Sequence, residues 1–181
     1  MLSCIATVSC EETPEYTPTK KPEVVVRDSS YVVRVMQFNI LMNDSEQEGH
    51  KWSDDRKEPC LRMLRRVNPD VVALEEVRLP QQEDLLAAFP EYTSVQYPKN
   101  GNKNGVGQRN MIMWKKDAVE MLDWGKFWFS KDRTSSVGTN NSNLFDDPDA
   151  TQKMVVYAKF KQKATGKIFW EYSAHFFAVN S

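Results

Sequence analysis

The sequence predicts an α/β (α+β) fold, and three features carry that prediction. Residues 71–74 form a continuous apolar run rich in β-branched side chains, which is typical of a strand buried on both faces. Helical patterns lie on either side of this run. From residue 93 onwards the pattern changes to short alternating segments separated by turns, which indicates antiparallel hairpins. This order of elements fits a layered mixed sheet better than a doubly wound nucleotide-binding fold.

The elements are expected in the following order. A first strand covers 31–40, where one face is consistently apolar apart from Gln37. A helix over 53–67 opens with acidic residues, which suit the amino end of a helix dipole, and presents apolar side chains on one face. The central strand covers 70–78. The remaining elements are a short amphipathic helix from Pro80 to Phe89, a strand over 93–97, paired strands over 110–116 and 119–130, and a hairpin of strands over 153–162 and 168–177.

Composition limits the classes of function. The 181 residues suggest one domain, since domains typically run to ~100–200 residues. A net charge of −1 argues against tight, non-specific nucleic-acid binding, although a nucleic acid held by a metal ion stays open as a substrate. With three cysteines and two histidines, the chain has neither a disulfide framework nor a His-rich zinc site. No apolar run approaches the ~18 residues that span a membrane, and no Gly-rich phosphate loop occurs.

Residues 1–30 differ from the rest, and residues 31–181 are expected to form the domain. Three prolines in a polar stretch indicate a linker. The segment ending at Cys10, followed by two glutamates, is similar to the end of a bacterial lipoprotein signal, but no basic start or full apolar core precedes it. Lipidation of Cys10 would tether the protein to a membrane outside the cytoplasm, and a disordered tail is the alternative.

Polar residues at the ends of two strands are the first candidates for a site. A buried carboxylate is costly unless it is paired or binds a metal, so Glu75 and Glu76 at the end of a core strand indicate a site. The alternative is that they begin a solvated loop. Asn39 interrupts the apolar end of the first strand, and a buried amide needs a hydrogen-bond partner, a metal ion or a substrate oxygen. An asparagine bonded to turn backbone is the alternative there.

Four segments give the chain a resemblance to the endonuclease/exonuclease/phosphatase family, whose fold is deoxyribonuclease-I-like. These segments are 35–40, 69–77, 108–117 and 125–130, and Trp52, Arg56 and His175 fall in the expected order around them. The resemblance runs from about Val32 to His175. It implies a four-layer αββα sandwich in which two sheets pack face to face.

The resemblance also implies a chemistry, the hydrolysis of phosphate esters with a divalent metal, Mg²⁺ or Mn²⁺. It assigns the metal to Glu76 with Asn39 beside it, and both side chains suit a hard cation that would polarise a phosphoryl oxygen. His175 matches the family histidine near the scissile phosphate, where some relatives use it for acid–base work. Arg78 and Asn110 are expected to bind substrate, with an ordinary surface arginine as the alternative for Arg78.

Several positions depart from the family pattern. Gln108 stands where the family has a glutamate that partners the histidine, and a glutamine cannot ionise or relay a proton. Phe177 stands where an acid usually follows the histidine, and Ser173-Ala174 replace Asn-Thr. The family's Gly-Asp-x-Asn and Ser-Asp-His segments do not occur in the 181 residues. We therefore expect a domain that is incomplete at its carboxyl end, exposes apolar surface, and does not catalyse by itself.

Two classes of function stay open. The first is a metal-dependent phosphoesterase (a phosphodiesterase, nuclease or phosphatase) of unknown substrate, and Asn39, Glu76 and His175 favour it. The second is a non-catalytic surface or binding module on the same scaffold, and Gln108 and Phe177 favour that.

Overall fold

The structure is a computed structural model of the whole chain, and it describes residues 32–43, 48–101, 107–135 and 153–176. The elements run in the order β1, η2, α1, β2, α2, β3, β4, β5, β6 and β7, where η2 is a single turn of π-helix. Cys10, Phe177 and the expected tail over 1–30 lie outside the described residues. No helix in the described part is long and apolar enough to cross a membrane.

The first sheet carries the central strand at its middle. Its four strands lie in the order β1-β2-β4-β3, with bounds Val35–Asn39, Val71–Val77, Arg109–Lys115 and Tyr92–Pro98. β1 and β2 are parallel, and β4 is antiparallel to both of its neighbours. Residues 71–74 are fully buried, which confirms the strand predicted from their continuous apolar run.

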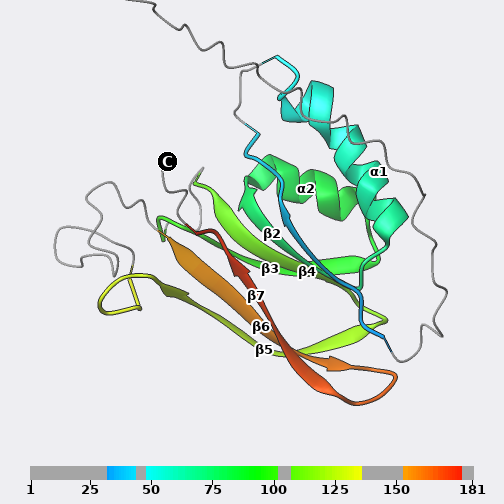
Figure 1. Cartoon of the computed structure of the whole chain (residues 1–181), viewed down its shortest axis with the longest axis vertical. Coiled ribbons are helices and arrows are strands. Elements are labelled where there is room, and N and C mark those ends of the chain that lie inside the picture. The colour runs from blue at the N-terminus through cyan, green and yellow to red at the C-terminus, as the bar shows by residue number, and fades with distance from the viewer. Residues whose placement is uncertain (1–31, 44–47, 102–106, 136–152, 177–181) are drawn as a thin grey trace, which may run out of the picture.

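The second sheet contains β5 (Val119–Trp128), β6 (Met154–Gln162) and β7 (Ile168–Ala174), all antiparallel. The predicted hairpin between the last two strands is confirmed, and its turn uses Gly166 at a positive φ of 73°. The two sheets pack face to face (Figure 1). The core between them is apolar and contains Val71, Ala73, Ile112 and Trp114 from the first sheet and Trp128, Met154, Val156, Ala158 and Phe160 from the second.

Two helices cover the other face of the first sheet (Figure 1). They are α1 (Lys57–Val67), which follows η2 (Trp52–Arg56) directly, and α2 (Leu79–Ala88). The predicted apolar face of α1 is buried at Cys60, Leu61 and Leu64, while its arginines are exposed. Leu85 of α2 is also fully buried. The layers are therefore helices, first sheet and second sheet, which are three of the four layers of the predicted αββα sandwich; the described residues contain no helix over the second sheet.

Two details of the predicted strands were wrong. The strands over 110–116 and 119–130 do not pair, because β4 already has β2 on one edge and β3 on the other, so the chain crosses to the second sheet and β5 pairs with β6. In β1, the face carrying Val35 and Gln37 is exposed, and Met36 and Phe38 pack against the helical core instead. β1 is an edge strand whose helix-facing side packs in the core, while on its other side Gln37 donates to Glu171 and to the Tyr172 carbonyl of β7.

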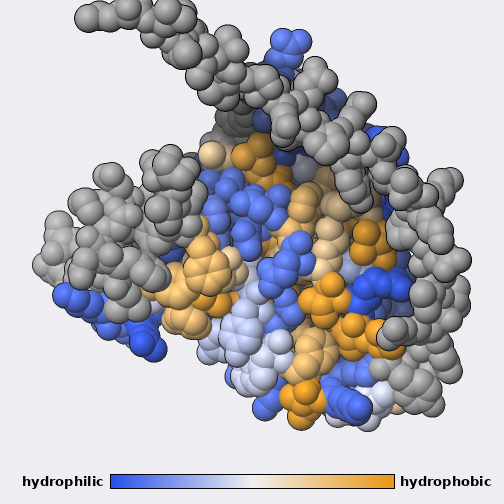
Figure 2. All heavy atoms as spheres, in the orientation of Figure 1, coloured by the Kyte–Doolittle hydropathy of each residue, from blue (hydrophilic) through white to orange (hydrophobic). Residues whose placement is uncertain are grey.

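The outer face of the second sheet is largely aromatic. Tyr157 lies within 5.8–6.3 Å of the ring centroids of Trp170, Tyr172 and Phe127. Trp170 and Tyr172 are 43% and 47% exposed. No helix among the described residues covers this face, and Figure 2 shows apolar side chains at the surface over the second sheet and along β1. The expected exposed apolar surface is present.

Candidate metal centre

Strands from both sheets end or begin at one edge of the sandwich (Figure 1), and the candidate residues gather there. β1 and β2 are parallel, so their carboxyl ends meet, with Asn39 opposite Glu75. β3 ends and β4 begins at this edge, since Arg109 lies opposite both Pro98 and Val77. In the second sheet β7 ends where β6 begins. Residues far apart in sequence are thereby brought together.

Asn39 and Glu76 are in direct contact at this edge. Asn39 Nδ2 donates to Glu76 Oε1 over 3.0 Å, and Asn39 Oδ1 accepts from the Leu41 backbone N–H over 2.9 Å. The Met42 N–H lies 3.4 Å from Glu76 Oε2. The amide therefore serves both the turn backbone and the carboxylate. Glu75 and Glu76 are both half-buried, so they do not simply begin a solvated loop.

The backbone around this contact is in a rare conformation. Glu76 has φ 61° and Leu41 has φ 55°, and the β2–β4 register shifts between Leu74 and Val77. A β-bulge re-aims a side chain, and left-handed non-glycine residues cost about 1–3 kcal/mol that the surroundings must offset. Here the bulge directs Glu76 towards the end of β1.

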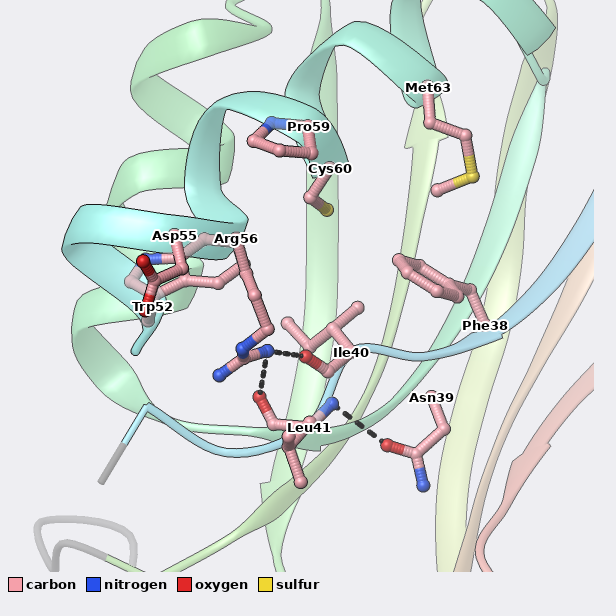
Figure 3. A pocket seen from close by; sticks show the side chains of 10 residues that line it. All are labelled: Phe38, Asn39, Ile40, Leu41, Trp52, Asp55, Arg56, Pro59, Cys60 and Met63. Atoms are coloured by element: carbon pink, nitrogen blue, oxygen red, sulfur yellow. Dashed lines mark hydrogen bonds between the residues drawn. The ribbon is translucent and has the colours of Figure 1, made fainter. Parts of the chain in front are cut away.

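Arg56 holds the turn that follows Asn39. Its guanidinium donates to the backbone carbonyls of Ile40 and Leu41 (Figure 3). It also donates to the carbonyl of Met42, and its Nε donates to that of His50. It projects from the end of η2, and a π-helical turn is often found at a functional site. The same turn lines an open, mainly apolar cavity of about 390 Å³ beside α1.

His175 reaches the carboxylate from the second sheet. It follows β7, and its Nε2 lies 3.4 Å from Glu76 Oε1, with 20% and 13% of the two side chains exposed. Its Nδ1 lies 2.6 Å from Lys99 Nζ, and that ammonium also donates to Gln108 Oε1 over 2.6 Å. The structure thus brings the predicted residues Asn39, Glu76, His175 and Gln108 together, and adds Lys99.

The charges at this edge shift several pKa values. Burial raises the pKa of Glu76, but the Asn39 hydrogen bond, the neighbouring His175, the Met42 N–H and Lys99 together bring it below its ordinary value. Burial, with the neighbouring Lys153, lowers the pKa of Lys99 to about 8. Burial, with Lys99 and Lys153, lowers the pKa of His175 to about 4. At neutral pH the site holds an ionised Glu76 beside a neutral imidazole.

The two residues predicted to bind substrate, Asn110 and Arg78, lie near this edge, one buried between the sheets and one at the start of α2. Asn110 is fully buried between the sheets, and its Nδ2 donates to the carbonyls of Met154 and Ser173. Ser173 in turn donates through its hydroxyl to the Leu74 carbonyl over 2.8 Å. These bonds fix β7 against the first sheet and so position His175, while a substrate contact of Asn110 stays a prediction. Arg78 caps α2 and lies 3.7 Å from Met42 Sδ.

A family profile described as "Endonuclease/Exonuclease/phosphatase family" matches residues 36–167. The chain belongs to the endonuclease/exonuclease/phosphatase family. The match covers β1 to the turn between β6 and β7, and therefore includes Asn39, Glu76 and Gln108. No curated protein matches the chain in sequence.

Solved structures of this family share the fold. An endonuclease/exonuclease/phosphatase from Bacteroides vulgatus is 28% identical with a TM-score of 0.63, over 80% of this chain and 52% of that one. A mannosyl-6-phosphatase from Bacteroides thetaiotaomicron VPI-5482 is 21% identical with a TM-score of 0.66, over 80% and 51%. The catalytic domain of human Nocturnin is 18% identical with a TM-score of 0.57, over 81% and 50%. The chain therefore spans about half the length of these relatives.

The donor set fits the divalent metal that the family resemblance implies. Mg²⁺ keeps several waters and needs only one or two carboxylates, with other oxygen ligands. Glu76 supplies an ionised carboxylate, and Asn39 Oδ1 has a second lone pair beyond the one that Leu41 uses. The described residues contain no group of three or more His, Cys, Asp or Glu side chains that could hold a metal. An all-protein cage is thus absent from the described part, but Mg²⁺ does not require one.

Lys99 was missed by sequence reasoning, and Arg56 was given no role in the site. Lys99 lies in the loop after β3, where no periodicity marks it, although 8% exposure for a lysine is unusual. Arg56 was placed only by its order in the family pattern, and its bonds to four carbonyls depend on a turn that no local signal predicts.

Proposed function

We propose that this edge of the sandwich is the metal-binding part of a site that hydrolyses phosphate esters. The observation that carries the proposal is the Asn39–Glu76 contact at 3.0 Å, made across two parallel strands by a strained residue. A Mg²⁺ ion, or Mn²⁺ in its place, would polarise a phosphoryl oxygen and offset its developing charge. Membership of a family of phosphate-ester hydrolases supports the same chemistry.

The chain's own residues would perform three tasks. Glu76 and Asn39 would hold the metal, and Arg56 would keep the turn after Asn39 in place. His175 would approach the phosphoryl group from the opposite sheet, since its Nε2 already faces Glu76. Arg78, at the amino end of α2, is our candidate for a contact to the substrate. The substrate class (nucleic acid or a smaller phosphate ester) stays open.

A second function, a non-catalytic binding module on the same scaffold, has one observation in its favour. The position that partners the histidine in the family is Gln108, and its amide oxygen accepts from Lys99. A glutamine cannot take up a proton, so the acid–base relay of some relatives is not available through this residue.

Mg²⁺ binding by calorimetry tests the proposed metal site. We expect the chain to bind Mg²⁺, the Glu76→Ala variant to lose binding, and the Glu120→Ala variant, changed at an exposed acid of β5, to retain it. Equal binding by all three proteins would contradict the site.

Hydrolysis of bis-p-nitrophenyl phosphate tests whether the 181-residue chain catalyses by itself. We expect the 181-residue chain to show no Mg²⁺-dependent cleavage, because the family's Gly-Asp-x-Asn and Ser-Asp-His segments do not occur in it. Turnover that disappears in Glu76→Ala would instead establish a complete hydrolase. Mg²⁺ binding without turnover would support the proposed metal site, whereas absence of both would favour the non-catalytic binding module.

A further inference from the structure

The histidine at the metal centre is held from both sides, and the two contacts specify where its proton sits. On one side, Lys99 Nζ lies 2.6 Å from His175 Nδ1. On the other, His175 Nε2 lies 3.4 Å from Glu76 Oε1. The lysine belongs to the loop after β3 and the glutamate to the bulge of β2, so two separate elements of the first sheet act on one ring.

The chemistry of these partners leaves one tautomer. An ammonium group has three donors and no acceptor, so Nδ1 must offer its lone pair to Lys99. An ionised carboxylate only accepts, so Nε2 must carry the hydrogen that faces Glu76. The Lys99 contact requires an unprotonated Nδ1 and the Glu76 contact requires a hydrogen on Nε2, so the two together specify the neutral Nε2–H form. Protonation at Nδ1 would place a second positive charge directly against the lysine.

Lys99 itself is held firmly in this position. Its ammonium donates to Gln108 Oε1 over 2.6 Å, and its backbone N–H donates to the Gln108 carbonyl over 2.9 Å. Its carbonyl accepts from Trp128 Nε1 over 2.8 Å. The residue is only 8% exposed. Gln108 therefore has a structural role: its neutral amide oxygen orients the Lys99 ammonium without forming an ion pair with it.

We propose that Lys99 is a positioning residue that fixes His175 as a neutral Nε2–H donor aimed at the phosphoryl site beside Glu76. The role at a phosphoryl group rests on the proposed function, whereas the contacts that fix the tautomer do not. In this arrangement His175 cannot accept a proton at Nε2, so it stabilises a phosphoryl oxygen by hydrogen bonding and does no acid–base work. A fixed hydrogen-bond donor, the Nε2–H of His175, therefore takes the place of the proton relay of some relatives.

Nitrogen NMR of the two histidines tests the inference without metal or substrate. The chain has only His50 and His175, and His50 is exposed and serves as the internal reference. At pH 7 we expect His175 to carry its proton on Nε2 alone, with Nδ1 at the position of an unprotonated nitrogen that accepts a hydrogen bond. A proton on Nδ1 would overturn the inference.

Variants at Lys99 add a second readout. Lys99→Met should move the Nδ1 signal to the unbonded position, Lys99→Arg should keep it near the wild-type position, and Lys161→Met, at an exposed lysine of β6, should leave it unchanged. An identical Nδ1 position in Lys99→Met and wild type would overturn the inference. If Lys99→Met does not fold, the Nδ1 position in wild type and Lys99→Arg, measured against His50, decides the question. Failure of Mg²⁺ binding would overturn the proposed function and leave these spectra unaffected.

Discussion

Asn39 and Glu76 are separated by 37 residues, yet their side chains are 3.0 Å apart. Their meeting follows from the parallel pairing of β1 with β2, which aligns the carboxyl ends of the strands, and from the bulge that turns Glu76 towards β1. A parallel pair places functional side chains at one edge by construction. The proposed metal centre is thus a consequence of topology as much as of residue type.

Asn39 is expected to contribute an oxygen ligand. Asn39→Ala should weaken Mg²⁺ binding by about 10–100-fold, the range seen when a group supporting a metal site is lost. Asn39→Asp keeps an oxygen at the same position and should bind Mg²⁺ at least as well as wild type. Calorimetry on the three proteins checks both outcomes. Unchanged affinity in Asn39→Ala would remove Asn39 from the site.

Arg56 is expected to stabilise the turn after Asn39. Arg56→Met leaves the carbonyls of Ile40, Leu41 and Met42 without their charged donor, so the free energy of unfolding should fall by about 2–3 kcal/mol. Arg62→Met, at an exposed arginine of α1, should stay within about 0.5 kcal/mol. Urea unfolding of the two variants gives the comparison. A similar small change in both would mean that the turn holds without Arg56.

Glu171 is expected to make stability depend on pH. It is buried between the sheets near Gln37, and burial raises its pKa to about 7. Because the folded pKa lies above the unfolded value, ionisation opposes folding, and stability is lost as the pH rises from about 5 to 8.

The variant Glu171→Gln isolates this effect from other titrating groups. Its free energy of unfolding relative to wild type should increase on the order of 2–3 kcal/mol between pH 5 and pH 8. Urea unfolding at the two pH values measures that difference. A constant difference between the two proteins would show that Glu171 does not titrate in this range.

The aromatic outer face of the second sheet is expected to cause self-association. Trp170 and Tyr172 are exposed in one cluster with Tyr157, and exposed apolar patches promote association. The double variant Trp170→Ser/Tyr172→Ser should show a smaller apparent mass by light scattering at high concentration. Arg62→Ser, on the helical side, should behave as wild type. An equal apparent mass in the double variant and wild type would show that the aromatic face does not mediate self-association.

Local sequence patterns predicted most of the helices and strands, but not which distant strands pair with one another. The apolar run at 71–74 and the helical face of α1 follow from residue periods, so both were predicted correctly. The partner of β5 depends on which edges of β4 are already occupied, and this is not visible in residues 110–130. The bulge at Glu76 likewise depends on the pairing of β2 with β4 and is not visible in the residues around it.

The site divides in the same way. Asn39 and Glu76 could be predicted because polar residues interrupt apolar strands at their ends. Lys99 could not, because its role depends on a contact with His175 across 76 residues and between two sheets. Lys99, which in our proposal turns His175 into a fixed hydrogen-bond donor, is therefore the site residue that the local sequence pattern marks least.

The most direct test of the proposed metal centre is paramagnetic broadening of the chain's NMR signals by substoichiometric Mn²⁺. We predict that the Asn39 side-chain amide, the Met42 backbone amide and the His175 ring broaden first, and that Glu76→Ala abolishes the effect at all three. Broadening that spares these groups, or that persists in Glu76→Ala, would show that Glu76 and Asn39 do not share a divalent cation.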